Sequence, residues 1–457
     1  MKNFLLIFSF ALTLSAFAQD KSKQFDSLFS APMGANLFNG NVLIAENGKV
    51  IFQKSYGTRD FSNKLPLNSE TIFELASVSK QFTAMGIMLL NKNGKIKYDD
   101  SLRKFFPQLP YPGVTVRHLL QHTGGLPDYM NLFDSLWPST KIAVNDDLIR
   151  LFAEHKPTRL FAPGEKWEYS NTGYAILAAI IEKVSGKTFG AYMNEQVFKP
   201  LGMTRTLVYR RRLEKRALPN YAYGYSWNKT SNKAILPDSS ADVAKMVYTL
   251  DGIQGDGIIN STTTDLFKWD RSLYTEQLIP KSMLAEAFAP AKLNSDSTYG
   301  YGFGWGISTL PVFGKRLSHT GGWPGYSTLI ERFPDHQHAI IILQNVEGPR
   351  PAIKNVRNIL FGIKDTAVSL TVDSAKLRDY LGVYELAPSF SITITADSQL
   401  YAQATGQSKF RLYAEKPDLY FLKEVEAKIQ FVRGTDGKVN NIILLQNGQE
   451  VPGKKIK

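Results

Sequence analysis

The pattern of hydrophobic and polar positions predicts two β-hairpins, one over residues 38–57 and one that joins the runs 327–333 and 338–345. In the first, two β-rich runs flank Asn47 and Gly48, a dipeptide that suits a tight primed turn. Helical segments are expected between the hairpins. This order indicates an α+β fold, in which an antiparallel sheet is assembled from both ends of a domain, is flanked by helices and carries an all-helical insertion.

One predicted helix runs from Ser77 to about Asn91 and is apolar on nearly every face. Such a helix belongs in the interior of a large protein, because no face of it suits water. Further helices are expected over residues 115–122, 171–185 and 352–361.

The hydrophobic and polar pattern changes after about residue 365, where it predicts short strands of alternating character without helices between them. These strands are expected over residues 391–395, 399–405, 428–433 and 439–445. Close, regular spacing of strands is typical of a small all-β barrel. We therefore expect a main domain over 19–364, a linker over 365–375 and a barrel over 376–457.

Residues 1–18 have the features of a secretory signal peptide. Lys2 gives a positive start, an apolar run follows, and Ala16 and Ala18 match the small-residue cleavage rule. No later apolar stretch approaches the length of a transmembrane segment; the best candidate, 174–181, is far too short. The sequence thus predicts an exported protein, periplasmic or secreted.

Composition narrows the chemistry of this 457-residue chain. It contains no cysteine, which excludes a disulfide, a thiol nucleophile and an iron–sulfur cluster. Lys and Arg number 54 against 41 acidic residues, for a net charge of +13. The basic residues are spread along the chain, whereas nucleic-acid binders concentrate them. We expect no nucleic-acid partner; the charge is compatible with an anionic cell envelope.

Known metal and esterase motifs are absent from the sequence. None of the six histidines belongs to an H-E-x-x-H motif, and His336 and His338 lie near a predicted strand turn, where surface positions are expected. No G-x-S-x-G elbow occurs, which argues against an α/β-hydrolase triad. We predict no metal and no cofactor.

A different serine arrangement opens the apolar helix, at residues 77–80 (SVSK). Ser77 and Lys80 share a helix face at this spacing, and burial disfavours the charged form of a lysine, which suits it to act as a base. The same spacing recurs at residues 101–104 and 226–229. Only Ser77 begins a long apolar helix, where free backbone N–H groups favour a developing oxyanion.

Two further segments carry polar groups suited to a cleft. Tyr169 and Asn171 precede another apolar helix, and their side chains can project from the same loop. Residues 319–322 (HTGG) precede the second hairpin and are expected on a strand that borders the cleft. Each motif alone is a weak signal; their order and spacing are specific.

Together these motifs resemble the serine β-lactamase-related family, which contains class C β-lactamases, DD-peptidases, family VIII esterases and D-aminopeptidases. The resemblance covers about residues 25–364, and the tail, 376–457, resembles the lipocalin-like barrel that some members carry. The matching segments are 77–80 (SVSK), 116–127 (VRHLLQHTGGLP), 163–164 (PG), 169–171 (YSN), 200–203 (PLGM), 255–258 (GDGI), 301–305 (YGFGW) and 319–321 (HTG).

The resemblance implies a role for each motif residue. Ser77 would be the acyl-accepting nucleophile, Lys80 its base and Tyr169 a second proton-transfer group. Asn171 would bind the substrate amide and orient Lys80. The backbone N–H groups of Ser77 and Gly322 would form the oxyanion hole.

The strand segment His319, Thr320 and Gly321 would contact the substrate, whereas His122 matches a structural turn. Class C β-lactamases usually carry lysine at the position of His319. A histidine is charged only part of the time at neutral pH, so the anchor for a substrate carboxylate is expected to be weaker and pH-dependent.

The predicted function is an exported serine hydrolase that acts through an acyl-enzyme on amides or peptides, such as D-residue-containing cell-wall peptides. A carboxylesterase and a weak class C-type β-lactamase are alternatives within the same chemistry. A penicillin-binding sensor that acylates without turnover, and a nucleic-acid binder, are the alternatives of other classes. The expected partner is a small-molecule or peptide substrate.

Overall fold

The protein is described here by a computed structural model, which places residues 20–31, 38–228, 233–346, 350–363, 374–388, 390–407, 409–422, 427–446 and 449–457. The segment interpreted as a signal peptide, residues 1–18, lies outside the described residues. The chain forms two compact units, residues 1–349 and 350–457, which are considered separately below.

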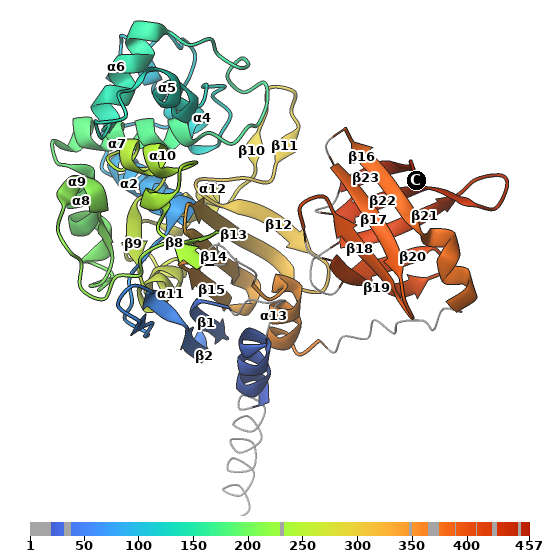
Figure 1. Cartoon of the computed structure of the whole chain (residues 1–457). Helices are drawn as coiled ribbons and strands as arrows, with labels where there is room; N and C mark the ends of the chain where they lie inside the picture. Colours follow the sequence, from blue (N-terminus) through green and yellow to red (C-terminus); the bar gives the residue numbers. More distant parts are fainter. Residues whose placement is uncertain are drawn as a thin grey trace, which may run out of the picture. The chain divides into compact units, whose positions relative to one another are not determined.

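The first unit is built on a six-stranded antiparallel sheet with the order β12-β13-β14-β15-β1-β2 (Figure 1). Its strands are β1 (Gly40–Glu46), β2 (Lys49–Tyr56), β12 (Gly306–Leu310), β13 (Gly314–Trp323), β14 (Tyr326–Phe333) and β15 (His338–Gln344). The register pairs Val42 of β1 with Ile342 of β15. The first and last strands in sequence therefore meet inside the sheet, which confirms the prediction of a sheet assembled from chain ends.

Both predicted hairpins are present. Asn47 and Gly48 have φ angles of 51° and 75°, the left-handed pair that a primed turn needs. The expectation that His338 is at the surface is wrong. His338 is buried at the start of β15 and its Nδ1 accepts a hydrogen bond from the Asn47 backbone N–H, at 3.1 Å, whereas His336 is exposed.

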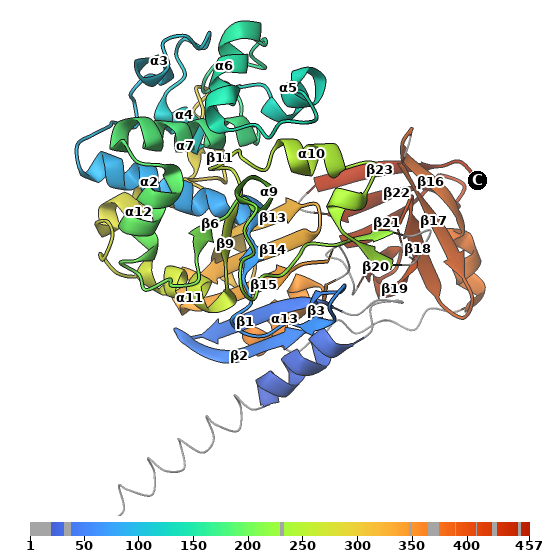
Figure 2. The same ribbon diagram turned by 60° about the vertical axis from the view of Figure 1, so that its left-hand side comes forward.

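The predicted buried helix is α2 (Lys80–Lys92), preceded by the 3₁₀ turn η1 (Ala76–Ser79). It lies between the sheet and α7 (Asn171–Ser185), as Figures 1 and 2 both show. A Cβ on Gly86 would lie 2.8 Å from the Ile181 side chain, so the two helices pack closely there. The helix α7 has the predicted bounds: Ser170 caps it and Gly186 ends it in the left-handed conformation.

The helix predicted over 115–122 is shorter than expected. Thr115 caps it through the His118 backbone N–H, and it is α4 (Val116–Leu120). It stops at Leu120 because His122 has a φ of 60°, outside the helical region.

The helical insertion and the smaller sheets complete the first unit. Its other helical elements are α3 (Leu102–Phe105), α5 (Tyr129–Leu136), α6 (Asn145–His155), α8 (Phe189–Met193), the π-helical turn η2 (Asn194–Phe198), α9 (Arg211–Glu214), η3 (Pro237–Ser239), α10 (Ala244–Thr249), α11 (Thr263–Ser272), α12 (Lys281–Ala287) and η4 (Pro334–His336). Its short strands are β3 (Thr58–Asp60), β4 (Leu65–Pro66), β5 (Phe73–Glu74), β6 (Leu207–Val208), β7 (Ser226–Asn228), β8 (Lys233–Ile235), β9 (Ile259–Ser261), β10 (Ala291–Lys292) and β11 (Thr298–Tyr299).

The second unit contains α13 (Ile353–Leu360), the turn η5 (Ser374–Tyr380) and a closed eight-stranded antiparallel barrel (Figure 2). Its strands are β16 (Gly382–Ala387), β17 (Phe390–Ala396), β18 (Leu400–Ala404), β19 (Lys409–Lys416), β20 (Leu419–Leu422), β21 (Ala427–Arg433), β22 (Val439–Gln446) and β23 (Gln449–Lys455). Pairing of β16 with β23 closes it. The predicted barrel is confirmed. Tyr384, Phe431 and Ile442 belong to its core of buried side chains.

Candidate active site

Ser77 lies in the turn η1, between β5 and α2, and its neighbours hold that turn in place. The Leu75 backbone N–H donates to the Ile259 carbonyl at 2.9 Å, and the Leu75 carbonyl accepts from Thr328 Oγ1 at 2.7 Å. The preceding residue, Ala76, has a φ of 47°, a conformation that non-glycine residues rarely adopt. These two hydrogen bonds of Leu75 thus fix the chain just before the strained residue Ala76 and the Ser77 turn, and such strain is common at functional sites.

Lys80 is the side chain that joins the motifs. It is 0% exposed, and its Nζ lies 3.2 Å from Ser77 Oγ, 2.9 Å from Asn171 Oδ1 and 2.8 Å from the Asp256 carbonyl oxygen. A neutral amine has two N–H groups, which match the two carbonyl acceptors, and one lone pair, which can face the Ser77 hydroxyl. The geometry therefore suits transfer of a proton between Ser77 and Lys80.

Tyr169 and Asn171 reach the site from the N-terminus of α7. The Ser170 side chain accepts from the Gly173 N–H and so fixes the start of the helix. Asn171 contacts Lys80, as given above, and the Tyr169 ring centroid lies 4.9 Å from Lys80 Nζ. Because Tyr169 is 38% exposed, its hydroxyl-bearing ring is accessible to a substrate.

His122 lies behind these groups in an aromatic cluster. Its ring centroid is 4.5 Å from that of Tyr169 and 4.6 Å from that of Tyr301, and its Nδ1 accepts from the Ser170 N–H at 3.1 Å. Burial and the Lys80 charge hold the pKa of His122 well below its ordinary value. A neutral ring that accepts a backbone hydrogen bond supports the Tyr169 loop.

The HTG segment lies on β13, next to the Ser77 turn. His319 is 8% exposed; its Nε2 lies 2.9 Å from the Tyr301 hydroxyl and its Nδ1 2.7 Å from the Thr320 carbonyl oxygen. Burial, together with the nearby Lys80 charge, lowers the pKa of His319 to about 3. The ring is therefore neutral at neutral pH, in contrast to the partial charge expected from an ordinary histidine.

Gly321 lets this strand approach the serine turn. A Cβ on Gly321 would lie 2.2 Å from the Leu75 carbonyl oxygen and 3.2 Å from the Ala76 Cβ. Thr320 and Gly322 are exposed on either side of it, and nothing lies within 4 Å of a Cβ placed on Gly322. The strand thus contacts the turn through Gly321 and leaves Gly322 open to a ligand.

A cavity opens at Ser77, which we call the Ser77 cavity. Of the residues predicted for the site, Ser77, Asn171 and Gly322 line it, whereas Tyr169 and the His319 ring do not. Its remaining lining residues are Glu74, Ala76, Tyr129, Met130, Leu250, Ile253, Asp256, Gly257, Ile258 and Trp323.

Sequence reasoning gave no role to three polar residues of this cavity: Glu74, Tyr129 and Asp256. The Tyr129 hydroxyl donates to Asp256 Oδ2 at 2.9 Å, and burial raises the pKa of the Asp256 carboxyl. Asp256 belongs to the GDGI segment used for the family resemblance, and that placement was the one signal available for it.

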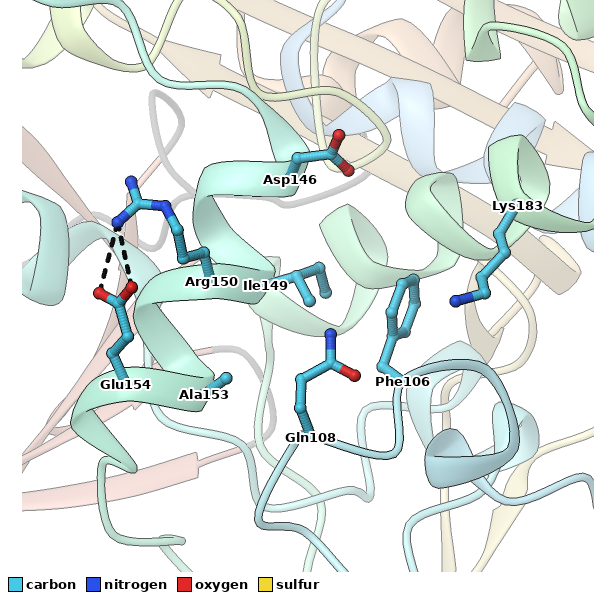
Figure 3. A pocket seen from close by; sticks show the side chains of 8 residues that line it. All are labelled: Phe106, Gln108, Asp146, Ile149, Arg150, Ala153, Glu154 and Lys183. Atoms are coloured by element: carbon cyan, nitrogen blue, oxygen red, sulfur yellow. Dashed lines mark hydrogen bonds and ion pairs between the residues drawn. The ribbon is translucent and has the colours of Figure 1, made fainter.

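A separate hollow lies among α6, α7 and the segment after α3 (Figure 3). Of its charged groups, Arg150 contacts Glu154, and Lys183 Nζ lies 5.0 Å from the centroid of the Phe106 ring. None of the motif residues line it. We therefore consider the Ser77 cavity to be the candidate active site.

Within the described ranges, no group of three or more His, Asp or Glu side chains is arranged to hold a metal ion. In the same part of the chain, no helix combines the length and the apolar character that crossing a bilayer requires.

Comparison with known proteins identifies the class. A family model described as Beta-lactamase matches residues 25–362, and one described as a domain of unknown function, DUF3471, matches residues 367–455. The first match covers most of the chain and includes every motif segment described above. The chain belongs to the β-lactamase family.

Within that family the chain is similar to penicillin-binding proteins. It is 40% identical to Penicillin-binding protein 4* of Bacillus subtilis (strain 168), over 94% of this chain and 98% of the relative. It is 29% identical to the Putative penicillin-binding protein PbpX of the same organism, over 68% and 71% of the two chains.

Solved structures share the fold. The penicillin binding protein from Bacillus halodurans aligns with a TM-score of 0.61 and 25% identity, over 72% of this chain and 96% of that one. The D-amino acid amidase from Ochrobactrum anthropi SV3, complexed with D-phenylalanine, aligns with a TM-score of 0.59 and 24% identity, over 78% and 99%. At that identity the second likeness shows the fold alone.

Proposed function

We propose that this chain is an exported serine hydrolase that acts through an acyl-enzyme on Ser77, with amides and peptides, such as D-residue-containing cell-wall peptides, as substrates. The observation that carries the proposal is the buried Lys80, whose Nζ lies within hydrogen-bond distance of Ser77 Oγ and Asn171 Oδ1. Nucleophilic catalysis by serine needs such an adjacent base.

In the acylation step, Lys80 takes the proton of the Ser77 hydroxyl while Oγ attacks the substrate carbonyl carbon. The carbonyl oxygen becomes an oxyanion, which the backbone N–H groups of Ser77 and Gly322 stabilise; both residues line the cavity. Asn171 donates its amide to the substrate and, through Oδ1, orients Lys80.

Collapse of the tetrahedral intermediate breaks the bond to the leaving amine, which needs a proton. Tyr169 supplies it, because its ring lies 4.9 Å from Lys80 Nζ and is open to solvent. The lysine proton can then return to the tyrosine oxygen. In deacylation Tyr169 passes its proton to the neutral Lys80, and its phenolate oxygen then takes a proton from a water molecule whose oxygen attacks the acyl carbon. Collapse of the second tetrahedral intermediate breaks the ester bond to Ser77, and Lys80 returns its proton to Ser77 Oγ.

The choice of amide substrates is supported by two observations. The relatives and fold neighbours of the chain include penicillin-binding proteins and a D-amino acid amidase. The His319 ring, neutral at neutral pH, offers no full positive charge to a substrate carboxylate. An amide that needs no carboxylate anchor suits the site better than a substrate that does.

The test is labelling followed by turnover. A fluorescent penicillin or a fluorophosphonate should label the protein, and the adduct should map to Ser77; undiminished labelling of Ser77→Ala would overturn the proposal. Release of product is then measured with D-peptides, p-nitrophenyl esters and a chromogenic cephalosporin. Labelling without any release would favour a penicillin-binding sensor instead, and release from esters alone would favour a carboxylesterase.

A further inference from the structure

The Ser77 cavity contains a carboxyl group that the proposed mechanism does not use. Glu74 ends β5, three residues before Ser77, and lines the cavity although the residue is only 8% exposed. In the described part of the chain, no group lies within hydrogen-bond or ion-pair distance of its carboxylate. A buried carboxylate without a partner is costly, so such a group either takes up a proton or binds a cationic partner.

The arginines nearest to Glu74 are already paired with other carboxylates. Arg212 donates through Nε to Asp238 at 2.7 Å and through NH1 to Asp251 at 3.0 Å, and Arg211 contacts Asp238. Their charges are therefore largely matched without Glu74. Asp256 adds a second carboxyl to the cavity lining, and that carboxyl accepts a hydrogen bond from the Tyr129 hydroxyl.

Large apolar side chains also form part of the cavity wall. Met130, Leu250, Ile253 and Trp323 line it together with the carboxyl groups. An occupant that matches this wall has a hydrophobic body and a positive charge. Peptides and amino-acid derivatives carry ammonium, a compact positive charge, either as an α-amino group or on a lysine side chain.

The position of the cavity decides which part of the substrate it receives. Ser77 and Gly322, the proposed oxyanion-hole residues, line it, whereas Tyr169, the proposed donor to the leaving group, does not. The cavity therefore holds the acyl part of the substrate. We propose that Glu74 is a specificity-determining residue that binds an ammonium group on the acyl part of amide or peptide substrates; this assignment rests on the function proposed above.

The ionisation of Glu74 gives the binding a pH dependence. Burial raises the pKa of Glu74 to about 7, helped by Asp251 and Asp256 and opposed by Arg212 and Arg211. The hydroxyls of Tyr221 and Tyr326 also face it and have raised pKa values, so they stay neutral. Glu74 is thus mostly protonated at pH 5.5 and half ionised at pH 7, while an α-ammonium, with a pKa of about 7.7–8.0, stays charged.

Binding is best measured without turnover, in Ser77→Ala protein, by calorimetry. The ligands are D-phenylalanine amide, which carries an α-ammonium, N-acetyl-D-lysine amide, which carries a side-chain ammonium, and the neutral N-acetyl-D-phenylalanine amide. At least one ammonium ligand should bind tenfold or more tightly than the neutral one. Its affinity should rise about tenfold from pH 5.5 to 7, and that of the neutral ligand should not change.

In the Ser77→Ala protein, the additional substitution Glu74→Gln should remove both the preference for ammonium ligands and the pH dependence of their affinity. The matched control is Glu70→Gln, which removes a charge at an exposed residue that pairs with Arg205 and does not line the cavity; it should change neither. In the enzyme with Ser77 intact, Glu74→Gln should raise KM for ammonium amides at least tenfold and leave kcat and the hydrolysis of N-acetyl amides within twofold.

The outcomes separate the two proposals. Equal binding of ammonium and neutral ligands, or an ammonium preference that survives Glu74→Gln, would overturn the role of Glu74 whatever the enzyme hydrolyses. An ammonium preference that depends on Glu74, in a protein whose Ser77 is never acylated, would instead support the binding role and overturn the proposed hydrolase. The ammonium ligand that binds more tightly shows whether Glu74 recognises an α-ammonium or a side-chain ammonium group.

Discussion

Three segments of the chain carry serine and lysine three positions apart, and the structure describes both residues in two of them, at 77–80 and 101–104, which it uses differently. At the first, Lys80 is wholly buried and faces three neutral oxygens, one of which is Ser77 Oγ. At the second, Ser101 caps α3 by accepting from the Arg103 N–H, and Lys104 pairs with Asp100 with more than half of its side chain exposed. The spacing of serine and lysine is the same in both segments. The two lysines differ in their burial and in their hydrogen-bond and ion-pair partners.

The comparison explains why the motif alone is a weak signal. A lysine that is exposed and paired with a carboxylate stays charged and has no free lone pair. Lys80 has no carboxylate within ion-pair distance among the described residues, and its oxygen neighbours accept two protons and leave one direction for the serine. The buried environment of Lys80 is therefore what suits it to act as a base. The spacing of serine and lysine in the sequence only allows the two side chains to lie close together.

The largest expected effect is the loss of the nucleophile. Ser77→Ala should abolish labelling by a fluorescent penicillin and lower amide hydrolysis by about 10⁶-fold, because no other hydroxyl takes its place beside Lys80. Ser101→Ala is the matched control and should leave both unchanged. Labelling that depends on Ser101 would reverse the comparison between the two segments.

The two lysines should differ nearly as much. Lys80→Gln should lower kcat/KM by about 10²–10⁴-fold, the usual contribution of a general base. Lys104→Gln removes an exposed ion pair, so it should leave kcat/KM unchanged and alter the free energy of unfolding by no more than about 0.5 kcal/mol. Steady-state kinetics and urea denaturation measure both. Equal losses of activity in the two variants would contradict the role of burial.

The two glycines of β13 sharpen the comparison next to the serine turn. In Gly321→Ala the new methyl would lie 2.2 Å from the Leu75 carbonyl oxygen, so the strand and the turn must separate. We expect a loss of about 1–3 kcal/mol in the free energy of unfolding and at least a tenfold loss of acylation rate.

Gly322→Ala is the control, since open space surrounds its Cβ position. It should leave the free energy of unfolding within about 0.5 kcal/mol of the wild type. Stability is measured by urea denaturation and acylation by the rate of penicillin labelling. Equal destabilisation by the two substitutions would show that close contact with the turn is not what requires glycine at position 321.

Much of the first unit could be predicted from the sequence because its signals are local. Asn47 with Gly48 determines the first turn, and Ser170 with Gly186 delimits α7. The sequence pattern indicated four of the eight barrel strands, which was enough to predict a small all-β barrel. Four strands were not predicted: β16, β19, β20 and β23, the last of which contains Pro452 and Gly453. Closure of the barrel supplies their pairing partners.

The cavity was harder to predict, because distant segments build it. Tyr129 and Asp256 are 127 positions apart and form one hydrogen bond. Glu74 lies close to Ser77 in sequence, yet its burial depends on packing that no local pattern reports. The sequence predicted the residues carried by motifs, and the structure added those that meet through the fold.

The smallest expected effect is on the pH dependence of stability and concerns His319, which is buried near Lys80. The His319 ring has two polar neighbours, the Tyr301 hydroxyl and the Thr320 carbonyl oxygen. Its folded-state pKa is lowered to about 3 from an unfolded value near 6.5. The unfolded chain therefore binds a proton first as the pH falls, and stability is lost from about pH 6.5 downward. At pH 7 this group contributes no such penalty.

His319→Gln removes the titrating group and keeps hydrogen-bonding capacity. The variant should be less stable than the wild type at pH 7, because the contact with the Tyr301 hydroxyl changes, and this deficit should shrink by about 2 kcal/mol at pH 5. Urea denaturation of both proteins at the two pH values isolates the difference from other titrating groups. A deficit that stays constant between pH 7 and pH 5 would mean that His319 takes up a proton in the folded protein as readily as in the unfolded chain.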